Sequence, residues 1–119
     1  MCAHDMVVLT RDEKIQNIVR RIANKTNALG KKIKKQQGEA ELLRIIMQQV
    51  GRQNLLVREE RKHNKVMRDI ESNTKLLKEY TNVLKSFFKN SKKYTDQEIN
   101  GLHRESFEKI VNYVKIYSS

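Results

Sequence analysis

Apolar residues recur along the first half of the chain at the spacing of a helix that packs lengthwise against another helix. Steps of alternately four and three residues from Ile15 to Val57 meet an apolar residue at ten of thirteen positions. A composition of 38% hydrophobic residues would give about five such matches by chance. This repeat is typical of paired helices. Its helix-seam residues are Ile15, Val19, Ile22, Leu29, Ile33, Leu43, Met47 and Val50.

A second apolar repeat runs from Leu56 to Phe88, one residue out of phase with the first. Its helix-seam residues are Met67, Ile70, Leu77 and Leu84, and flanking apolar residues such as Val83 and Phe87 widen the stripe. A straight helix does not change phase in this direction, so the shift predicts a chain break.

Either of two segments could form the main turn of the chain. Residues 51–54 begin with Gly51 and continue with polar residues, which is the composition of a turn after a helix. Residues 30–38 have a glycine at each end and a polar, basic interior. An interior glycine costs a helix about 0.5–1 kcal/mol relative to alanine. The first repeat nevertheless passes through 30–38 in phase, which favours a continuous helix there.

A third helix is predicted from a local start signal. Thr95 lies three residues before Glu98, and this spacing of hydroxyl and carboxylate forms a capping box ahead of an apolar run. We expect a helix over about 95–117 with a broad apolar face. The residues of that face are Ile99, Leu102, Phe107, Ile110, Val111, Val114 and Tyr117.

Together these patterns predict an all-α protein. The expected fold is a long, coiled-coil-like helical hairpin with a shorter third helix, forming a three-helix bundle with helices at about 11–50, 52–90 and 95–117. Residues 11–119 would form a single helical domain, and residues 1–10 a flexible amino-terminal segment. The 119 residues include four glycines and no proline or tryptophan, which argues against an all-β domain.

The charge is large and unevenly distributed. The chain has 25 Lys and Arg against 14 Asp and Glu, a net charge of +11, and residues 1–38 contain nine of the bases and three of the acids. Such a cluster can bind phosphates or an acidic partner, or simply form a solvated face. The candidate partner- or phosphate-binding residues are Arg20, Arg21, Lys25, Lys31, Lys32, Lys34 and Lys35. A second basic group, partly offset by Glu59 and Glu60, consists of Arg58, Arg61, Lys62, Lys65 and Arg68.

No arrangement of residues predicts catalysis, a metal site or a cofactor. His4, His63 and His103 are about 40 or more residues apart, and a structural zinc site needs four close nitrogen or sulfur ligands. Cys2 lies at the chain terminus, where a nucleophile is poorly fixed. We therefore expect a protein that is not an enzyme.

The expected function is that of a structural or adaptor protein. Long helices expose extended faces, and the excess charge makes such a face attract a larger, acidic partner or assembly. The alternative is a nucleic-acid-binding regulator that contacts the phosphate backbone without sequence specificity. The first 79 residues contain no aromatic side chain on which bases could stack. Pairing with a second copy, or with another helical protein, would cover seam residues that one chain leaves exposed.

The cysteine content and the apolar runs of the sequence indicate the cellular compartment. A single cysteine cannot form an internal disulfide bond, which favours a reducing environment. The first ten residues lack the basic start and apolar length of a secretory signal, and no run of ten apolar residues could span a membrane. We expect an intracellular protein, cytoplasmic or nuclear.

Overall fold

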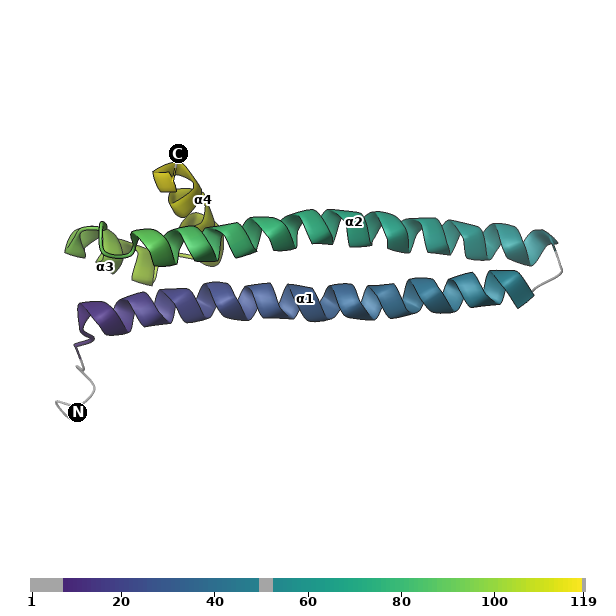
Figure 1. Cartoon of the computed structure of the whole chain (residues 1–119), viewed down its shortest axis with the longest axis horizontal. Coiled ribbons are helices and arrows are strands. Elements are labelled where there is room, and N and C mark those ends of the chain that lie inside the picture. The colour runs from purple at the N-terminus through teal and green to yellow at the C-terminus, as the bar shows by residue number, and fades with distance from the viewer. Residues whose placement is uncertain (1–7, 50–52, 119) are drawn as a thin grey trace. The chain divides into compact units, whose positions relative to one another are not determined.

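Helices are the only regular secondary structure over the residues that the structure describes. This computed structural model describes residues 8–49 and 53–118. In chain order its helices are α1 (Arg11–Gln49), α2 (Gln53–Asn90), α3 (Asp96–Arg104) and α4 (Phe107–Ser118), as Figure 1 shows. The predicted all-α class is confirmed.

α1 passes through both glycines that could have ended it. Gly30 and Gly38 lie inside one helix of 39 residues, so residues 30–38 are not the main turn. α1 ends at Gln49 and α2 begins at Gln53. Val50 and the first residues of the other predicted turn lie outside the described residues, as do residues 1–7 of the predicted amino-terminal segment.

The segment predicted as one third helix forms two helices. α3 ends at Arg104 and α4 begins at Phe107, so the described chain contains four helices where three were expected. Ser106 starts α4, because its carbonyl oxygen accepts a hydrogen bond from the Ile110 amide at 3.0 Å and its hydroxyl accepts from the Lys109 amide at 3.4 Å. If α3 and α4 were one straight helix, the apolar side chains of the α3 segment and those of the α4 segment would point in directions roughly a quarter of a turn apart. The break allows both halves to face one core.

The chain divides into two compact units. The four-helix unit contains residues 8–25 and 80–118 of the described chain, and therefore the start of α1, the end of α2, and both short helices. The hairpin unit contains residues 26–79, and therefore the rest of α1 and α2.

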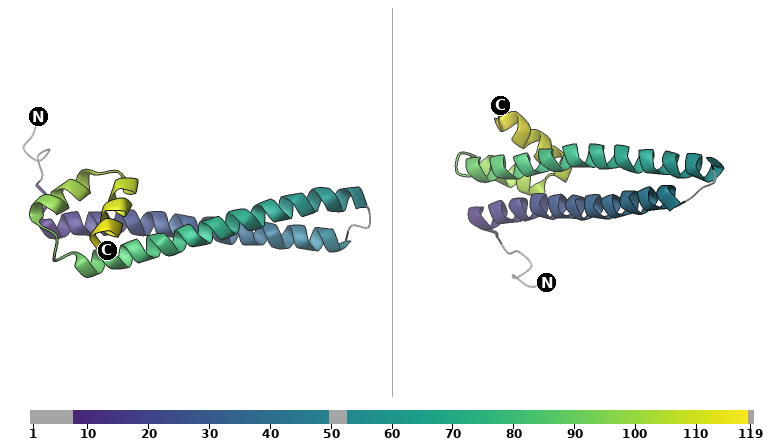
Figure 2. Two further views of the ribbon diagram at one scale, coloured as in Figure 1. Left: turned by 90° about the horizontal axis from the view of Figure 1, so that it is seen from above. Right: turned by 45° about the vertical axis from the view of Figure 1, so that its right-hand side comes forward.

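The four-helix unit has a well-developed core. Figure 2 shows α3 and α4 lying beside the start of α1 and the end of α2. Phe87, Ile22 and Ile110 are completely buried there, and the rings of Tyr94 and Tyr117 stack with centroids 4.2 Å apart. Burial of each large apolar side chain contributes about 1.5–3 kcal/mol. The buried members of this core are Ile18, Ile22, Val83, Phe87, Tyr94, Ile99, Leu102, Ile110, Val111 and Val114.

In this unit α2 buries the residues predicted to flank its seam more completely than the seam residues themselves. Val83 and Phe87 are buried, whereas Phe88 is 69% exposed and Leu84 is only partly buried. Helices α1, α3 and α4 all contribute to this core, so the buried face of α2 widens and turns towards them. Ile18 of α1 is buried for the same reason, and the seam residues Ile15 and Val19 pack against the core while staying partly exposed.

The hairpin unit has a much thinner core. In its described part only Ile33, Ala40 and Leu43 are buried apolar side chains. The Asn73 amide donates to the Gln36 side-chain oxygen at 3.0 Å, which links α2 to α1. The predicted seam residues Leu29, Met47, Ile70 and Leu77 are half-buried.

Met67 departs from the predicted seam, because it is 46% exposed. Two helices can cover each other only along one narrow stripe, so positions at the edge of the repeat stay in contact with solvent.

The capping box predicted at α3 is confirmed. The Thr95 hydroxyl accepts from the Glu98 amide at 3.1 Å, and the Glu98 carboxylate accepts from the Thr95 amide at 2.8 Å. The Tyr113 hydroxyl donates to the other Glu98 oxygen. The Thr95 amide, and then the Tyr113 hydroxyl, hold the pKa of Glu98 below its ordinary value.

Removing the Thr95 hydroxyl tests this cap. We expect Thr95→Ala to lower the free energy of unfolding by about 1 kcal/mol, because the Glu98 amide loses its acceptor. Thr74→Ala is the matched control, since Thr74 is an exposed residue within α2. Its effect should stay within about 0.5 kcal/mol. Urea titrations followed by circular dichroism measure both, and equal losses would contradict the cap.

The same carboxylate should make stability depend on pH. Its pKa is lower in the folded than in the unfolded chain, so its contribution is present at neutral pH and is lost as the pH falls through the folded pKa. Glu98→Gln keeps an N3 side chain that suits a capping box but removes the titration. We expect the variant to lose less unfolding free energy than the unmodified protein between neutral and acidic pH. Identical losses would contradict this assignment.

Candidate anion-binding surface

Four lysines surround a buried isoleucine in the part of α1 that belongs to the hairpin unit. We call Lys31, Lys32, Lys34 and Lys35 the α1 lysines; all four are exposed. Ile33 between them is buried. At about 100° per residue, Lys31 and Lys35 lie on the side of α1 opposite Ile33, while Lys32 and Lys34 flank it. No described acid lies within ion-pair distance of these four ammonium groups.

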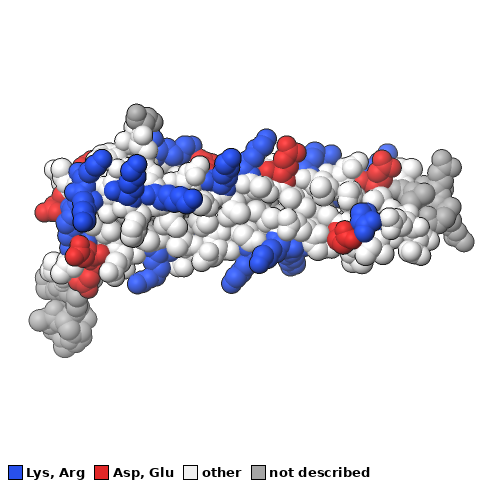
Figure 3. Space-filling view, viewed as in Figure 1, with Lys and Arg blue, Asp and Glu red and all other residues white. Residues whose placement is uncertain are grey.

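A second row of bases lies along α2 in the same unit. Arg58, Arg61, Lys65 and Arg68 are exposed, and their spacing of three, four and three residues places them on one helix face. We call them the α2 basic stripe. Lys62 does not belong to it, because its ammonium lies 3.9 Å from the Glu59 carboxylate. Figure 3 shows basic side chains projecting from the helices of the hairpin unit.

None of the ion pairs in the described part of the hairpin unit involves these eight bases, although Glu39 lies four residues after Lys35 and Asp69 four residues after Lys65. Three ion pairs in the described part of the hairpin unit join Glu41 to Arg44, Glu59 to Lys62 and Glu71 to Lys75. Like charges one turn apart on a helix repel each other by a few tenths of a kcal/mol. An anionic partner would relieve that repulsion, so these two groups of four bases are the strongest candidate binding sites of the hairpin unit.

A shallow groove lies next to the α1 lysines. It has a volume of about 540 Å³, and its walls come from both helices of the hairpin unit. Ile33 and Leu77 provide its apolar surface, and Lys31 and Lys34 lie at its edge. The groove opens at Gly30, where a side chain is missing. The remaining lining residues are Thr26 and Asn27.

The other three predicted binding residues lie in the four-helix unit, and each of them makes a contact there. The half-buried Arg21 donates to the His103 carbonyl at 3.0 Å and to the Glu105 carbonyl at 2.5 Å, at the end of α3. The Lys25 ammonium lies 5.7 Å from the centre of the Phe107 ring. Arg20 is exposed, and among the described residues its guanidinium donates only within α1, to the Asn17 side-chain oxygen at 3.5 Å. Arg21 therefore stabilises a helix end, where carbonyl groups lack helical partners.

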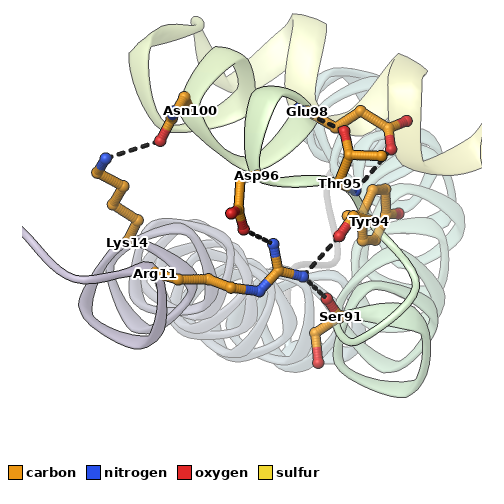
Figure 4. A network of polar contacts seen from close by, with 8 residues as sticks. All are labelled: Arg11, Lys14, Ser91, Tyr94, Thr95, Asp96, Glu98 and Asn100. Carbon is orange, nitrogen blue, oxygen red and sulfur yellow. Dashed lines mark hydrogen bonds and ion pairs between the residues drawn. The ribbon is translucent and has the colours of Figure 1, made fainter.

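A polar network in the four-helix unit is not evident from the sequence. As Figure 4 shows, the Arg11 guanidinium forms an ion pair with Asp96 at 2.7 Å and donates to the Tyr94 carbonyl at 2.6 Å and the Ser91 carbonyl at 3.0 Å. The polar residues that α1 directs towards α3 recur every three or four positions beside the apolar seam. That spacing is the only sequence signal, because their partners lie 80 or more residues away along the chain.

The described residues provide no metal centre. No group of three or more His, Cys, Asp or Glu side chains in residues 8–49 and 53–118 could hold a metal ion. The His103 ring lies 3.4 Å from the Asn17 amide, and Cys2 and His4 lie outside the described residues. No helix in the described part of the chain is both long enough and apolar enough to cross a bilayer.

Comparison with protein-family models, with curated proteins and with solved structures finds no match for this chain. The surface of the hairpin unit is therefore interpreted from its own charges and geometry. Its two distinctive features are the eight bases without described acid partners and the groove beside Gly30.

Two adjacent arginines allow a direct test of the difference between a structural and a free cation. We expect Arg21→Ala to lower the free energy of unfolding by about 2 kcal/mol, because two carbonyl groups lose a charged donor. Arg20→Ala should change it by less than about 0.5 kcal/mol, because Arg20 is exposed. Urea unfolding of both variants makes the comparison. A loss at Arg20 as large as that at Arg21 would contradict the structural role of Arg21.

Proposed function

We propose that this protein is a non-enzymatic adaptor that binds the acidic surface of a larger protein or assembly through its hairpin unit. The observation that carries the proposal is the set of eight exposed bases, the α1 lysines and the α2 basic stripe, with no described acid within ion-pair distance. Such an excess steers an acidic partner towards the protein and accelerates association.

The thin core of the hairpin unit supports a binding role. Its helices keep much of their apolar seam half-exposed, and a partner can cover that surface while its carboxylates meet the lysines. A second copy of this chain is a poorer occupant, because each copy carries a charge of +11.

An acidic protein fits this surface better than a nucleic acid does. Ile33 and Leu77 offer apolar contacts beside the lysines, and a phosphate backbone gains little from them.

In the nucleic-acid alternative, the α2 basic stripe would contact the phosphates. Its ten-residue span is about 15 Å, over which one strand of a duplex presents about four phosphates. Backbone contacts of this kind would carry no sequence specificity.

A charge-reversal experiment tests the proposal. The variant K31E/K32E/K34E/K35E reverses the α1 lysines, and K85E/K89E/K92E/K93E makes the same change of charge at four exposed lysines of the four-helix unit. Fluorescence anisotropy measures the affinity of each variant for labelled polyglutamate. We expect the first variant to bind at least about tenfold more weakly, a loss of about 1.4 kcal/mol, and the second to change by less than about threefold.

The outcomes separate the candidate functions. Equal losses in the two variants, or no binding of the unmodified protein to polyglutamate near 50 mM salt, would overturn the proposal. Tighter binding to a DNA duplex would establish the nucleic-acid alternative instead. Its log affinity should then fall with log salt by about 0.9 per neutralised phosphate. Circular dichroism confirms that both variants remain helical.

A further inference from the structure

Gly30 occupies a position where the fold of the chain does not require a glycine. It lies in the interior of α1, and a Cβ atom placed there would meet no atom within 4 Å. Its backbone has no positive φ angle. Glycine weakens a helix interior, and neither crowding nor backbone geometry in the described structure excludes a larger residue.

The missing side chain opens the groove on the hairpin unit. Leu77 is half-buried and gives the groove apolar surface between α1 and α2, whereas Ile33 lines the groove with only 7% of its surface exposed. Lys31 and Lys34 stand at its edge, one helical turn apart and exposed. The groove therefore combines apolar surface, positive charge at its border and open access at Gly30.

We propose that this groove is the docking site for an acidic amphipathic helix of the partner protein. This inference rests on the proposed adaptor function and specifies the kind of partner. The apolar residues of the partner helix contact Ile33 and Leu77, and its carboxylates reach the ammonium groups of Lys31 and Lys34. This is the helix-in-groove mode of recognition, in which apolar anchors give contact area and flanking charges give orientation.

The geometry favours a helix over an extended acidic segment. A glycine lets a second backbone approach α1 closely, as small residues do wherever helices pack at short distance. The two lysines are three residues apart, and carboxylates three or four residues apart on a partner helix share one face. The partner would act as the third helix that the hairpin unit lacks.

Gly38 provides a matched control in the same helix and the same unit. It is also a site where an added Cβ would meet no atom within 4 Å, and it does not line the groove. Gly30→Leu and Gly38→Leu therefore have identical composition, and both replace a glycine with a better helix former. Only Gly30→Leu places a side chain in the groove.

Two labelled probes distinguish groove binding from general charge attraction. The first is a synthetic peptide of about 20 residues, about 30 Å long as a helix, with leucines on one face and glutamates beside them. The second is polyglutamate, which has the charge without the apolar face. We expect Gly30→Leu to weaken binding of the helical peptide by at least about tenfold and to leave binding of polyglutamate unchanged. Gly38→Leu should leave both affinities unchanged.

The results separate this inference from the function on which it rests. Equal peptide affinities for the two leucine variants, or a peptide that binds no more tightly than polyglutamate, would overturn the groove assignment while leaving the adaptor proposal intact. Failure of the unmodified protein to bind either probe would overturn both. Amide chemical shifts locate the peptide: changes centred on residues 26–34 and Leu77 support the groove, and changes centred elsewhere contradict it.

Discussion

The structure depends on how many helices surround each stretch of apolar seam. A pair of helices buries only the stripe along which they face each other, whereas additional helices close the core from other sides. In the four-helix unit Ile18, Ile22 and Phe87 have no exposed surface. In the hairpin unit the seam is mostly half-exposed, although its sequence repeat is equally regular. The same seam pattern thus gives a closed core in one unit and an accessible one in the other.

The number of packed helices also decides which basic side chains have partners within the fold. Where the short helices α3 and α4 pack, arginines have backbone carbonyls to satisfy, and Arg11 and Arg21 both donate to carbonyl groups at chain bends or helix ends. Where only two helices are present, the α1 lysines have no helix ends within reach and stay in solvent. Net charge alone therefore overstates the binding surface, because part of the excess holds the fold together. Exposed bases outside any described ion pair remain in both units, and in the hairpin unit they include the α1 lysines beside the groove.

Local patterns predict local structure well in this chain. The phased repeat correctly carries α1 through Gly30 and Gly38, and the spacing of Thr95 and Glu98 correctly marks the start of α3. A Thr and a Glu three residues apart also stand at Thr10 and Glu13, where the structure has the same reciprocal hydrogen bonds. The break before α4 was missed, because it depends on how two apolar faces reach a common core. The role of Arg21 was missed because its partners lie 82 and 84 residues away in sequence.

The groove at Gly30 combines the accessible apolar seam of the hairpin unit with its exposed bases. A helix that served only to pair with α2 would gain stability from alanine at this position, and the free space around Gly30 shows that a Cβ atom would fit. Four lysines next to the same glycine add mutual repulsion to a unit whose core is already thin. Both features lower the stability of the free hairpin, and both become favourable when an acidic helix covers them. Binding would then stabilise the folded hairpin by mass action, so that partner recognition and hairpin stability are thermodynamically coupled.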